Sequence, residues 1–363
     1  MRQFFKVKEN VSLAPLTTLR IGGAARFFVT AVTESQVAEA VEFAAKNNLD
    51  LFVLGGGSNV LVSDRGFDGL VLQIGLLGVE SFEFLVPSSE LRGDSNAELG
   101  TRNAKLIKVG AGEDWDEFVE NCVKERLSGV ECLSGIPGLV GGTPVQNVGA
   151  YGQEVSETIV AVRCLDRTNG KIVTLTNADC GFTYRTSIFN STHRERYIVL
   201  AVTFRLVENG PPKIAYPELE RAVEMPASLS GVRDAVLRIR GKKSMLIDPR
   251  DPNSKSVGSF FKNPIVELEK LKEIQIAFPS VPYFEFGEMV KIPAAWLIEN
   301  AGFSKGFTLG NAGISENHTL ALINRGKSTA AEIIDLKDMI QAGVEARFGI
   351  TLCPEPVFVG FDA

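Results

Sequence analysis

Ser259 is the residue of this chain that most directly raises a question of chemistry. It stands in GSFFKNP, Gly258 to Pro264, between a charged, proline-containing run and a segment of helical character. A nucleophilic serine needs a base to take its proton, and the strand-to-helix nucleophile elbow reads G-x-S-x-G. Phe261 stands where that elbow needs its second glycine. Taken alone, Ser259 therefore fits either a small residue in a turn or a catalytic hydroxyl of another kind.

A first glycine-rich loop offers its backbone to a ligand. GGGSN, residues 55–59, follows the apolar strand LFVL. Glycine lets the backbone come close to a ligand and point successive N–H groups at an anion. The loop is no dinucleotide fingerprint, because Val60 stands where the last glycine is needed, and it lacks the G-K-[ST] of a P-loop. A phosphate nest and a tight structural turn both fit it.

A second and longer glycine-rich segment runs from Ser134 to Glu154 as SGIPGLVGGTPVQNVGAYGQE. A loop of this length inside a compact domain is usually functional. Its small, uncharged residues suit a close approach of backbone to a flat cofactor ring, whereas a flexible linker is richer in serine or charge. We expect this segment to bind a ligand.

Composition excludes several classes of function. The 363 residues, 45% hydrophobic and 23% charged, predict a globular protein of two or three domains. The net charge of −6 argues against binding to a nucleic-acid backbone. The sequence has no run of about 18 apolar residues, the length needed to cross a bilayer. The start MRQFFKVKEN lacks the apolar core of a signal peptide. We expect a cytoplasmic protein.

Cysteine and histidine usage predicts no metal site. The five cysteines form an odd set without C-x-x-C, so buried free thiols are expected. The only histidines are His193, expected on an exposed turn, and His318. His318 stands at the start of an apolar strand in SENHTLALIN. This position suits either a residue that lines a ligand-binding cleft or one with a capping role.

Hydrophobic periodicity and capping residues predict a mixed α and β chain. Helices are expected over residues 33–49, from Trp115, near VELEKLKEI, at PAAWLIENAG and from Thr329, two of them opened by the capping boxes Thr33/Gln36 and Thr329/Glu332. The expected apolar face of the second helix is Trp115, Phe118, Val119, Cys122 and Val123, and that of the last helix is Ile333, Leu336, Ile340 and Val344. From Val160 the pattern is mainly β, with a hairpin turn at Asn169-Gly170. The polar stretch 87–103 reads as a surface excursion between strands.

Several motifs in order resemble one enzyme family. TLRIGG (Thr18 to Gly23), the GGGSN loop and the long glycine-rich segment together resemble UDP-N-acetylenolpyruvoylglucosamine reductases, and the likeness continues through YRTSIF, GSFFKNP, PAAWLIENAG and PEPVFVG. Each motif alone is weak, but seven in sequence over nearly the whole chain are specific.

The resemblance implies an α+β fold and a cofactor. A two-lobed FAD-binding domain of the vanillyl-alcohol-oxidase (PCMH) type is implied, with one lobe over residues 1–77 and the other over 78–244, joined by the C-terminal residues 349–363. A third α+β lobe, 245–348, is implied to bind the nucleotide sugar. FAD is expected to be non-covalent, because many oxidases of this fold attach it through histidine and none precedes His193. NADPH is implied as co-substrate in the cleft that the sugar uses.

The implied reaction reduces UDP-N-acetylglucosamine enolpyruvate to UDP-N-acetylmuramate for peptidoglycan synthesis. Hydride from the reduced flavin N5 adds to C3 of the enolpyruvyl ether, and negative charge spreads over C2 and the carboxylate. A carbon of this kind is a strong base, so a serine hydroxyl protonates it as a general acid without a histidine partner. Ser259 matches the family's proton donor, and Lys262 is a candidate to restore its proton.

The resemblance also assigns the remaining site residues. Arg185 in YRTSIF matches the arginine that supports the substrate carboxylate, and Glu355 in PEPVFVG matches the glutamate that shares this task. Further substrate contacts carried over by motif are Tyr216, in a tyrosine loop that folds over the substrate, with Lys243, Asn263 and Tyr283. The expected FAD contacts are Ile21, Gly22, Gly55, Gly56, Gly57, Ser58, Asn59, Ser134, Gly135, Ile136, Pro137, Gly141, Gly142, Gln146, Asn147, Gly149, Ala150 and Tyr151.

Two alternative functions and one departure accompany this interpretation. The alternatives are an FAD-dependent oxidase of the same fold acting on an alcohol or lactone, and a non-catalytic nucleotide-sugar sensor, which the presence of Ser259, Arg185 and Glu355 argues against. The family often has Glu-Val-Arg near its C-terminus, whereas Pro356 and Val357 follow Glu355 here. This departure puts one substrate contact in question and leaves the reaction intact. Apart from the substrates, no nucleic acid, membrane or obligate protein partner is indicated.

Overall fold

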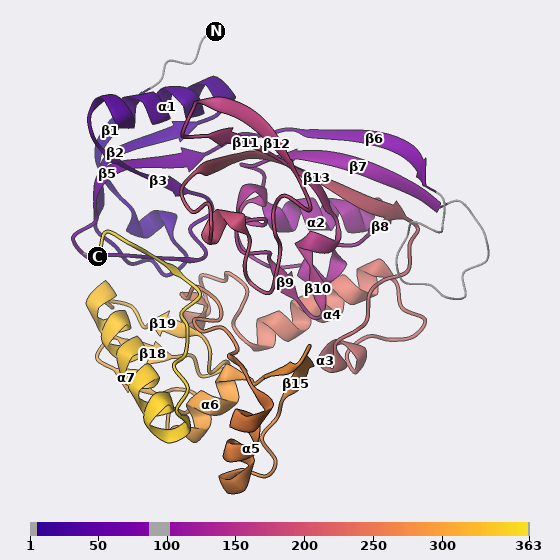
Figure 1. The fold of residues 1–363 in the computed structure, drawn as a ribbon, viewed down its shortest axis with the longest axis vertical. Helices are drawn as coiled ribbons and strands as arrows, with labels where there is room; N and C mark the ends of the chain where they lie inside the picture. Colours follow the sequence, from indigo (N-terminus) through magenta and orange to yellow (C-terminus); the bar gives the residue numbers. More distant parts are fainter. Residues whose placement is uncertain (1–5, 87–101, 362–363) are drawn as a thin grey trace. The chain divides into compact units, whose positions relative to one another are not determined.

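The computed structural model describes residues 6–86 and 102–361 (Figure 1). Spatial contacts between residues divide the chain into two compact units. Unit 1 holds Phe27–Gly56 and Gly69–Gly241 with the residues up to Glu9, and unit 2 holds Asn10–Arg26, Gly57–Asp68 and everything from Lys242 onward. The three lobes expected from the sequence stay a prediction. The expected surface excursion lies almost entirely outside the described residues.

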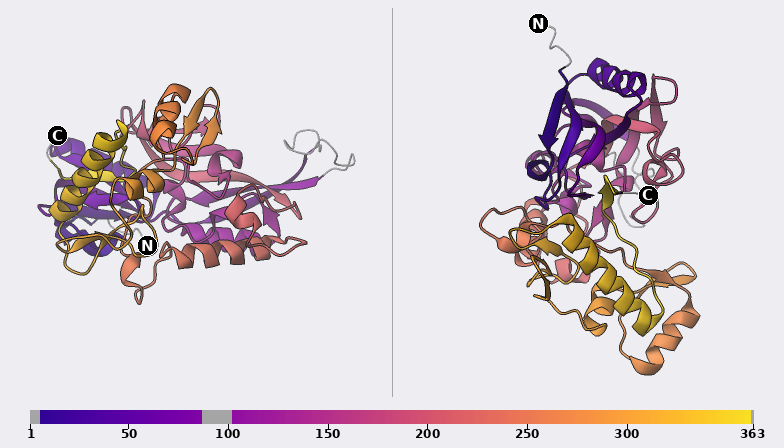
Figure 2. Two further views of the ribbon diagram at one scale, coloured as in Figure 1. Left: turned by 90° about the horizontal axis from the view of Figure 1, so that it is seen from below. Right: turned by 90° about the vertical axis from the view of Figure 1, so that its left-hand side faces the viewer.

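An antiparallel sheet forms the centre of unit 1. Its strand order is β12-β11-β13-β7-β6, with the short β8 also paired to β13; the bounds are β6 Val79–Val86, β7 Arg102–Gly110, β8 Leu127–Ser128, β11 Ile159–Asp166, β12 Lys171–Thr176 and β13 Tyr197–Glu208. Strands β6 and β7 pair in antiparallel register from Val79 opposite Val109 to Val86 opposite Arg102, and Figure 2 shows the chain from two further directions. The predicted hairpin at Asn169-Gly170 is confirmed, because β11 and β12 pair on either side of it.

Helix α2 (Trp115–Lys124) covers this sheet with the face that the sequence predicts. Trp115, Phe118, Val119, Cys122 and Val123 are all buried. The rings of Trp115 and Phe118 both contact Phe204 of β13, with centroids 5.8 and 5.1 Å apart. The spacing of apolar residues in α2 therefore identified its core contacts correctly.

A second sheet has the order β1-β2-β5-β3 (β1 Lys8–Ser12, β2 Ala24–Ala31, β3 Asp50–Leu54, β5 Phe67–Ile74). Helix α1 (Glu34–Lys46) precedes β3, and Thr33 caps it by accepting a hydrogen bond from the Gln36 N–H at 3.3 Å. The Gln36 side chain accepts from the Val32 N–H, one residue before the cap. The start of this helix is thus fixed by its predicted capping residues.

Unit 2 is built from α5 (Leu268–Ala277), α6 (Ala294–Asn300), α7 (Ala330–Phe348) and three small sheets. The sheets are β14-β16-β15, β17-β18-β19 and β20-β4 (β4 Val60–Val62, β14 Ile265–Val266, β15 Phe284–Phe286, β16 Met289–Lys291, β17 Thr308–Leu309, β18 Ala312–Ile314, β19 Leu322–Asn324, β20 Val357–Val359). The predicted stripe of α7, Ile333, Leu336, Ile340 and Val344, is fully buried. The Thr329/Glu332 capping box is confirmed, and the Asp64 carboxylate also accepts from the Ala330 and Ala331 N–H groups.

Two features differ from the sequence prediction. The C-terminal strand β20 pairs in parallel with β4, within the expected first lobe, and not with the second lobe to which residues 349–363 were assigned. The apolar residues VFV of β20 lie directly beside the buried residues VLV of β4. The structure also contains α4 (Leu229–Lys242) and the short α3 (Pro217–Glu220), which the predominantly β prediction missed. Buried Val232, Val236 and Ile239 give α4 a helical apolar face, interrupted by arginines.

Candidate active site

The segment that carries Ser259 is held by backbone hydrogen bonds on both sides. The Phe260 N–H donates to the Leu320 carbonyl at 2.8 Å, and its own carbonyl accepts from the Glu355 N–H at 2.8 Å. The rings of Phe260 and Phe261 are 0% and 1% exposed. Because both rings anchor the segment in the core, the neighbouring Ser259 has little freedom to move. Unit 2 therefore presents this hydroxyl in a defined place.

His318 is the side chain that the structure places next to Ser259. Its Nε2 lies 3.5 Å from the Ser259 Oγ, and both side chains are half-buried. The turn that carries His318 is closed by the Ala321 N–H, which donates to the His318 carbonyl at 3.0 Å. The sequence alone did not decide whether His318 lines the cleft or has a capping role. No local pattern links it to Ser259, since 59 residues separate them.

Glu355 lies beside the end of the first glycine loop. The Asn59 side-chain amide donates to the Glu355 carbonyl at 3.3 Å, and the Val357 N–H donates to the Asn59 carbonyl at 3.0 Å. Unit 2 thus brings together Asn59, an expected cofactor contact, and the expected catalytic residues Ser259 and Glu355. Val357, where the family often has arginine, is the first residue of β20 and is paired with Val60.

The glycines of unit 2 allow backbone to pack on backbone. Gly57 has φ +65°, and a Cβ built on it would lie 1.9 Å from the Leu16 carbonyl oxygen. Gly22 has φ +127°, and a Cβ there would lie 2.5 Å from the Val62 Cβ. The Thr18 N–H donates to the Gly57 carbonyl at 3.0 Å. TLRIGG and the end of GGGSN therefore form one tightly packed assembly in which only glycine fits.

Gly57→Ala is expected to lower the free energy of unfolding by roughly 2–3 kcal/mol, because the added methyl meets backbone and φ is positive. The control is Gly55→Ala, since a Cβ at Gly55 meets nothing within 4 Å. Urea denaturation of the two apoproteins measures the difference. Equal midpoints for both variants would contradict the packing described for Gly57.

The long glycine-rich segment packs tightly within unit 1 at some positions and leaves others open. A Cβ on Gly56 would lie 2.7 Å from the Gly138 Cα, and one on Gly141 would lie 2.6 Å from the Ala111 Cβ. In contrast, a Cβ on Gly55 or Gly142 meets nothing within 4 Å. The two glycine loops thus touch through bare backbone and keep backbone accessible beside the contact. This arrangement fits a ligand that approaches peptide groups closely.

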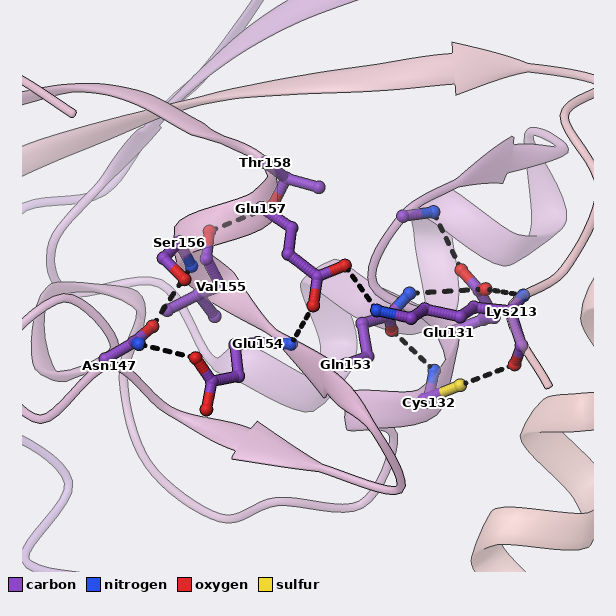
Figure 3. Close-up of polar contacts among 11 residues, drawn as sticks. Glu131, Cys132, Asn147, Gln153, Glu154, Val155, Ser156, Glu157, Thr158 and Lys213 are labelled. Atoms are coloured by element: carbon purple, nitrogen blue, oxygen red, sulfur yellow. Dashed lines mark hydrogen bonds and ion pairs between the residues drawn. The ribbon is translucent and has the colours of Figure 1, made fainter. Parts of the chain in front are cut away.

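Polar side chains fix the C-terminal half of this segment (Figure 3). The Asn147 amide donates to Glu154 at 2.8 Å and to the Thr183 carbonyl at 3.0 Å, and its oxygen accepts from the Ser156 N–H at 3.1 Å. The side chain expected to bind the cofactor is therefore engaged in shaping the loop. Ser134 is similar, because its buried hydroxyl donates to the Glu131 carbonyl at 2.7 Å.

Glu131, on the right of Figure 3, is fully buried. Its carboxylate accepts from the Gly129 N–H at 2.7 Å, the Lys213 N–H at 2.8 Å and the Gln153 amide at 3.3 Å. Gln153 in turn accepts from the Cys132 N–H at 2.9 Å. This carboxylate therefore joins the glycine-rich segment to the chain that leads towards Tyr216.

Glu131→Gln is expected to lower the free energy of unfolding by roughly 1–3 kcal/mol, because an amide NH₂ would face a buried N–H donor. Glu157→Gln is the matched control. Glu157 forms a half-exposed ion pair with Lys213 at 2.7 Å, so its loss should cost less than about 1 kcal/mol. Chemical denaturation of both variants tests this difference, and a larger effect at Glu157 would refute it.

The start of the glycine-rich segment is fixed by charged groups of α2 and α4. The Gly135 N–H donates to Asp116 at 2.6 Å, and the Gly135 carbonyl accepts from Arg240 at 3.1 Å. Arg233 pairs with Asp116 through both nitrogens, at 2.6 and 3.0 Å. Burial alone would raise the pKa of Asp116, but the hydrogen bonds from Arg233 and Gly135 outweigh it and lower the pKa. Asp116 therefore holds a negative charge that orients this loop.

Arg185 lies against the same segment of unit 1. A Cβ on Gly149 would lie 3.2 Å from the Arg185 Nη1, so glycine makes room for the guanidinium. Arg185 has φ +54°, and its carbonyl accepts from the Asn190 amide at 3.1 Å. A non-glycine residue held in this region costs energy and is typical of functional sites. The expected carboxylate-binding arginine and the expected cofactor loop are thus neighbours.

The expected substrate contacts occupy different positions in the two units. Tyr216 precedes α3 in unit 1, and its ring meets the Tyr151 ring edge-on with centroids 5.8 Å apart. Burial raises the pKa of Tyr151 to about 12. In unit 2, the Asn263 oxygen accepts from the Ala294 N–H at the start of α6, and Tyr283 is 45% exposed. Lys243 follows α4 directly.

Among residues 6–86 and 102–361, no cluster of histidine, cysteine and carboxylate side chains forms a metal site. Four of the five cysteines are buried, as expected, but Cys353 is exposed. In the described part of the chain no helix has the length and apolarity needed to span a membrane. The cytoplasmic location stays a prediction.

Comparison with known proteins identifies this chain as an FAD-dependent oxidoreductase. A sequence model of an FAD binding domain matches residues 25–176, and a model of the UDP-N-acetylenolpyruvoylglucosamine reductase C-terminal domain matches residues 250–359. The chain belongs to the UDP-N-acetylenolpyruvoylglucosamine reductase family. Relatives of that name from Thermobifida fusca and Streptomyces coelicolor are each 44% identical over 97% of this chain, which corresponds to 98% and 90% of their own lengths.

A solved structure supports the same assignment. The crystal structure of UDP-N-acetylenolpyruvylglucosamine reductase from Thermus caldophilus superposes with a TM-score of 0.65 at 25% identity, covering 98% of this chain and all of that one. The α+β fold class with an FAD-binding domain of the expected type is confirmed.

Proposed function

We propose that this protein uses NADPH to reduce UDP-N-acetylglucosamine enolpyruvate to UDP-N-acetylmuramate, in the synthesis of peptidoglycan precursors. The observation that carries the proposal is the grouping of Ser259 with Glu355 and Asn59 on backbone-bonded segments of unit 2. Ser259 is the proton donor to C2 of the enolpyruvyl ether, a role that suits a fixed neutral hydroxyl facing a basic carbon.

FAD fits the residues of both glycine loops, because they leave backbone open at Gly55 and Gly142. When bound, FAD supplies the hydride for C3 of the substrate. The open backbone at Gly55 and Gly142 would hold the cofactor, while Asn147 and Glu131 fix the shape of the second loop through their hydrogen bonds. No histidine precedes His193, so the attachment is non-covalent.

Arg185 and Glu355 stabilise the charge that develops on the substrate. A guanidinium offers paired N–H donors whose geometry matches a carboxylate. Glu355 shares this task only as a hydrogen-bond donor, because an ionised carboxylate accepts hydrogen bonds and cannot stabilise another anion. Tyr216, Lys243, Asn263 and Tyr283 bind the nucleotide sugar, for which their phenol, ammonium and amide groups are natural partners.

Stopped-flow absorbance of the flavin in the purified holoprotein tests the function. NADPH alone should bleach the flavin, and the enolpyruvyl sugar nucleotide should then restore its colour and yield a product two hydrogens heavier by mass spectrometry. Acid precipitation should release all of the yellow colour into the supernatant. If the sugar nucleotide fails to reoxidise the flavin, the reductase assignment is wrong for this chain.

A further inference from the structure

The hydroxyl proposed as proton donor has an imidazole beside it. The Ser259 Oγ and the His318 Nε2 are 3.5 Å apart, at the long end of hydrogen-bond distances. Catalytic hydrogen bonds are often long without substrate and shorten once it binds. The separation therefore places His318 within reach of the atom that loses a proton.

The backbone makes this proximity a fixed feature of unit 2. The Phe260 N–H donates to the Leu320 carbonyl at 2.8 Å, which joins the residue after Ser259 to the turn after His318. On the other side of the turn, the Ser315 N–H donates to the Ala321 carbonyl at 2.9 Å, and Thr319 donates to the Glu299 carboxylate. Both side chains are thus carried by segments that are bonded to one another.

In the proposed reaction Ser259 loses its proton and needs another group to supply a new one. Each reduction transfers its proton to carbon, and a serine alkoxide is far too basic to persist, so the hydroxyl must be reprotonated in every cycle. The tautomer of His318 decides whether it can help. If Nε2 accepts, the Ser259 proton points at the imidazole; if Nε2 donates, that proton stays free to face the substrate.

We propose that His318 is a positioning residue that donates Nε2–H to Ser259 and returns the proton that Ser259 gives to the substrate. This inference rests on the proposed function. As the Ser259 O–H bond breaks and the C2–H bond forms, the His318 Nε2–H bond breaks, a new Oγ–H bond forms, and the ring Nδ1 takes a proton from solvent, so the imidazole stays neutral. Exchange with solvent then returns the ring to its Nε2–H form. The net transfer is one proton from solvent to C2, and both side chains return to their starting form.

Kinetics of three holoprotein variants test the role. His318→Ala is expected to slow reoxidation of the flavin by the sugar nucleotide about 10–100-fold, less than Ser259→Ala, with unchanged reduction by NADPH. Added imidazole should restore the rate of His318→Ala but not that of Ser259→Ala. His318→Gln should stay slow, because its amide can donate a hydrogen bond but cannot release and regain the proton.

Several outcomes would overturn the inference. A normal rate in His318→Ala, a normal rate in His318→Gln, or a failure of imidazole to restore the former would each do so. If Lys262→Met slows flavin reoxidation by the sugar nucleotide and the His318 variants do not, Lys262 and not His318 returns the proton to Ser259. The proposed function fails separately, if the sugar nucleotide does not reoxidise the flavin of the unaltered protein.

A spectroscopic measurement is independent of turnover. The chain has two histidines, so a ¹⁵N-histidine label gives two imidazole signals, and His193→Gln assigns them. We expect the Nε2 of His318 to carry a proton at neutral pH. A neutral ring protonated only on Nδ1 would refute the inference even if every His318 variant failed to fold.

Discussion

Ser259→Ala is expected to slow reoxidation of the flavin by the enolpyruvyl sugar nucleotide by roughly 10²–10⁴-fold, the usual contribution of a general acid. This corresponds to about 2.7–5.4 kcal/mol of activation free energy. FAD content and reduction by NADPH should be unchanged, because the proton is needed only when C2 becomes basic. Stopped-flow absorbance separates the two half-reactions.

Ser254→Ala is the matched control for Ser259→Ala. Its hydroxyl donates to the Asp248 and Asp251 carbonyls at 2.7 and 2.8 Å, a structural role in the same region of the chain. It should leave both half-reactions nearly unchanged. If Ser259→Ala slowed both half-reactions equally, the cause would be a disturbed fold and not the loss of an acid.

Arg185→Ala is expected to slow the same half-reaction by roughly 10²–10³-fold, the typical cost of removing one donor from a developing anion. The positive charge matters most when electron density moves onto the substrate carboxylate. The loss should therefore appear mainly in kcat and not only in KM. Arg185→Lys should recover little, since an ammonium lacks the planar fork of the guanidinium.

Arg163→Ala provides the comparison for Arg185→Ala. Arg163 pairs with Glu34 at 2.8 Å and both side chains are more than a third exposed, so its removal should leave kcat and KM unchanged. A pure rise in KM for Arg185→Ala would show that the arginine binds substrate and transition state equally. That result would contradict its role in stabilising charge.

Local patterns predicted the secondary structure best where one face of an element meets the core. The apolar spacing of α2 and α7 identified their buried faces, and the capping residues Thr33 and Thr329 located two helix starts. The prediction failed at α4 because Arg233 and Arg240 lie on its buried face. Their charges are accommodated by Asp116, Gly135 and Tyr151, which are distant in sequence.

The family and its reaction class followed from the sequence because seven short motifs occur in order along nearly the whole chain. Such motifs preserve the residue types and glycines that a ligand requires locally. They placed Ser259, Arg185 and Glu355 in the proposed chemistry without any knowledge of which elements carry them. They also led to the view that Ser259 needs no histidine partner.

Tertiary structure alone decided what surrounds these residues. It placed His318 beside Ser259, paired the C-terminal strand with β4, and enclosed the Glu131 carboxylate among backbone donors. These contacts join residues far apart in the chain, and their energies come from packing and buried hydrogen bonds that leave no periodic trace in sequence. The sequence thus determined which chemical groups this protein has, and the fold decided which of them meet.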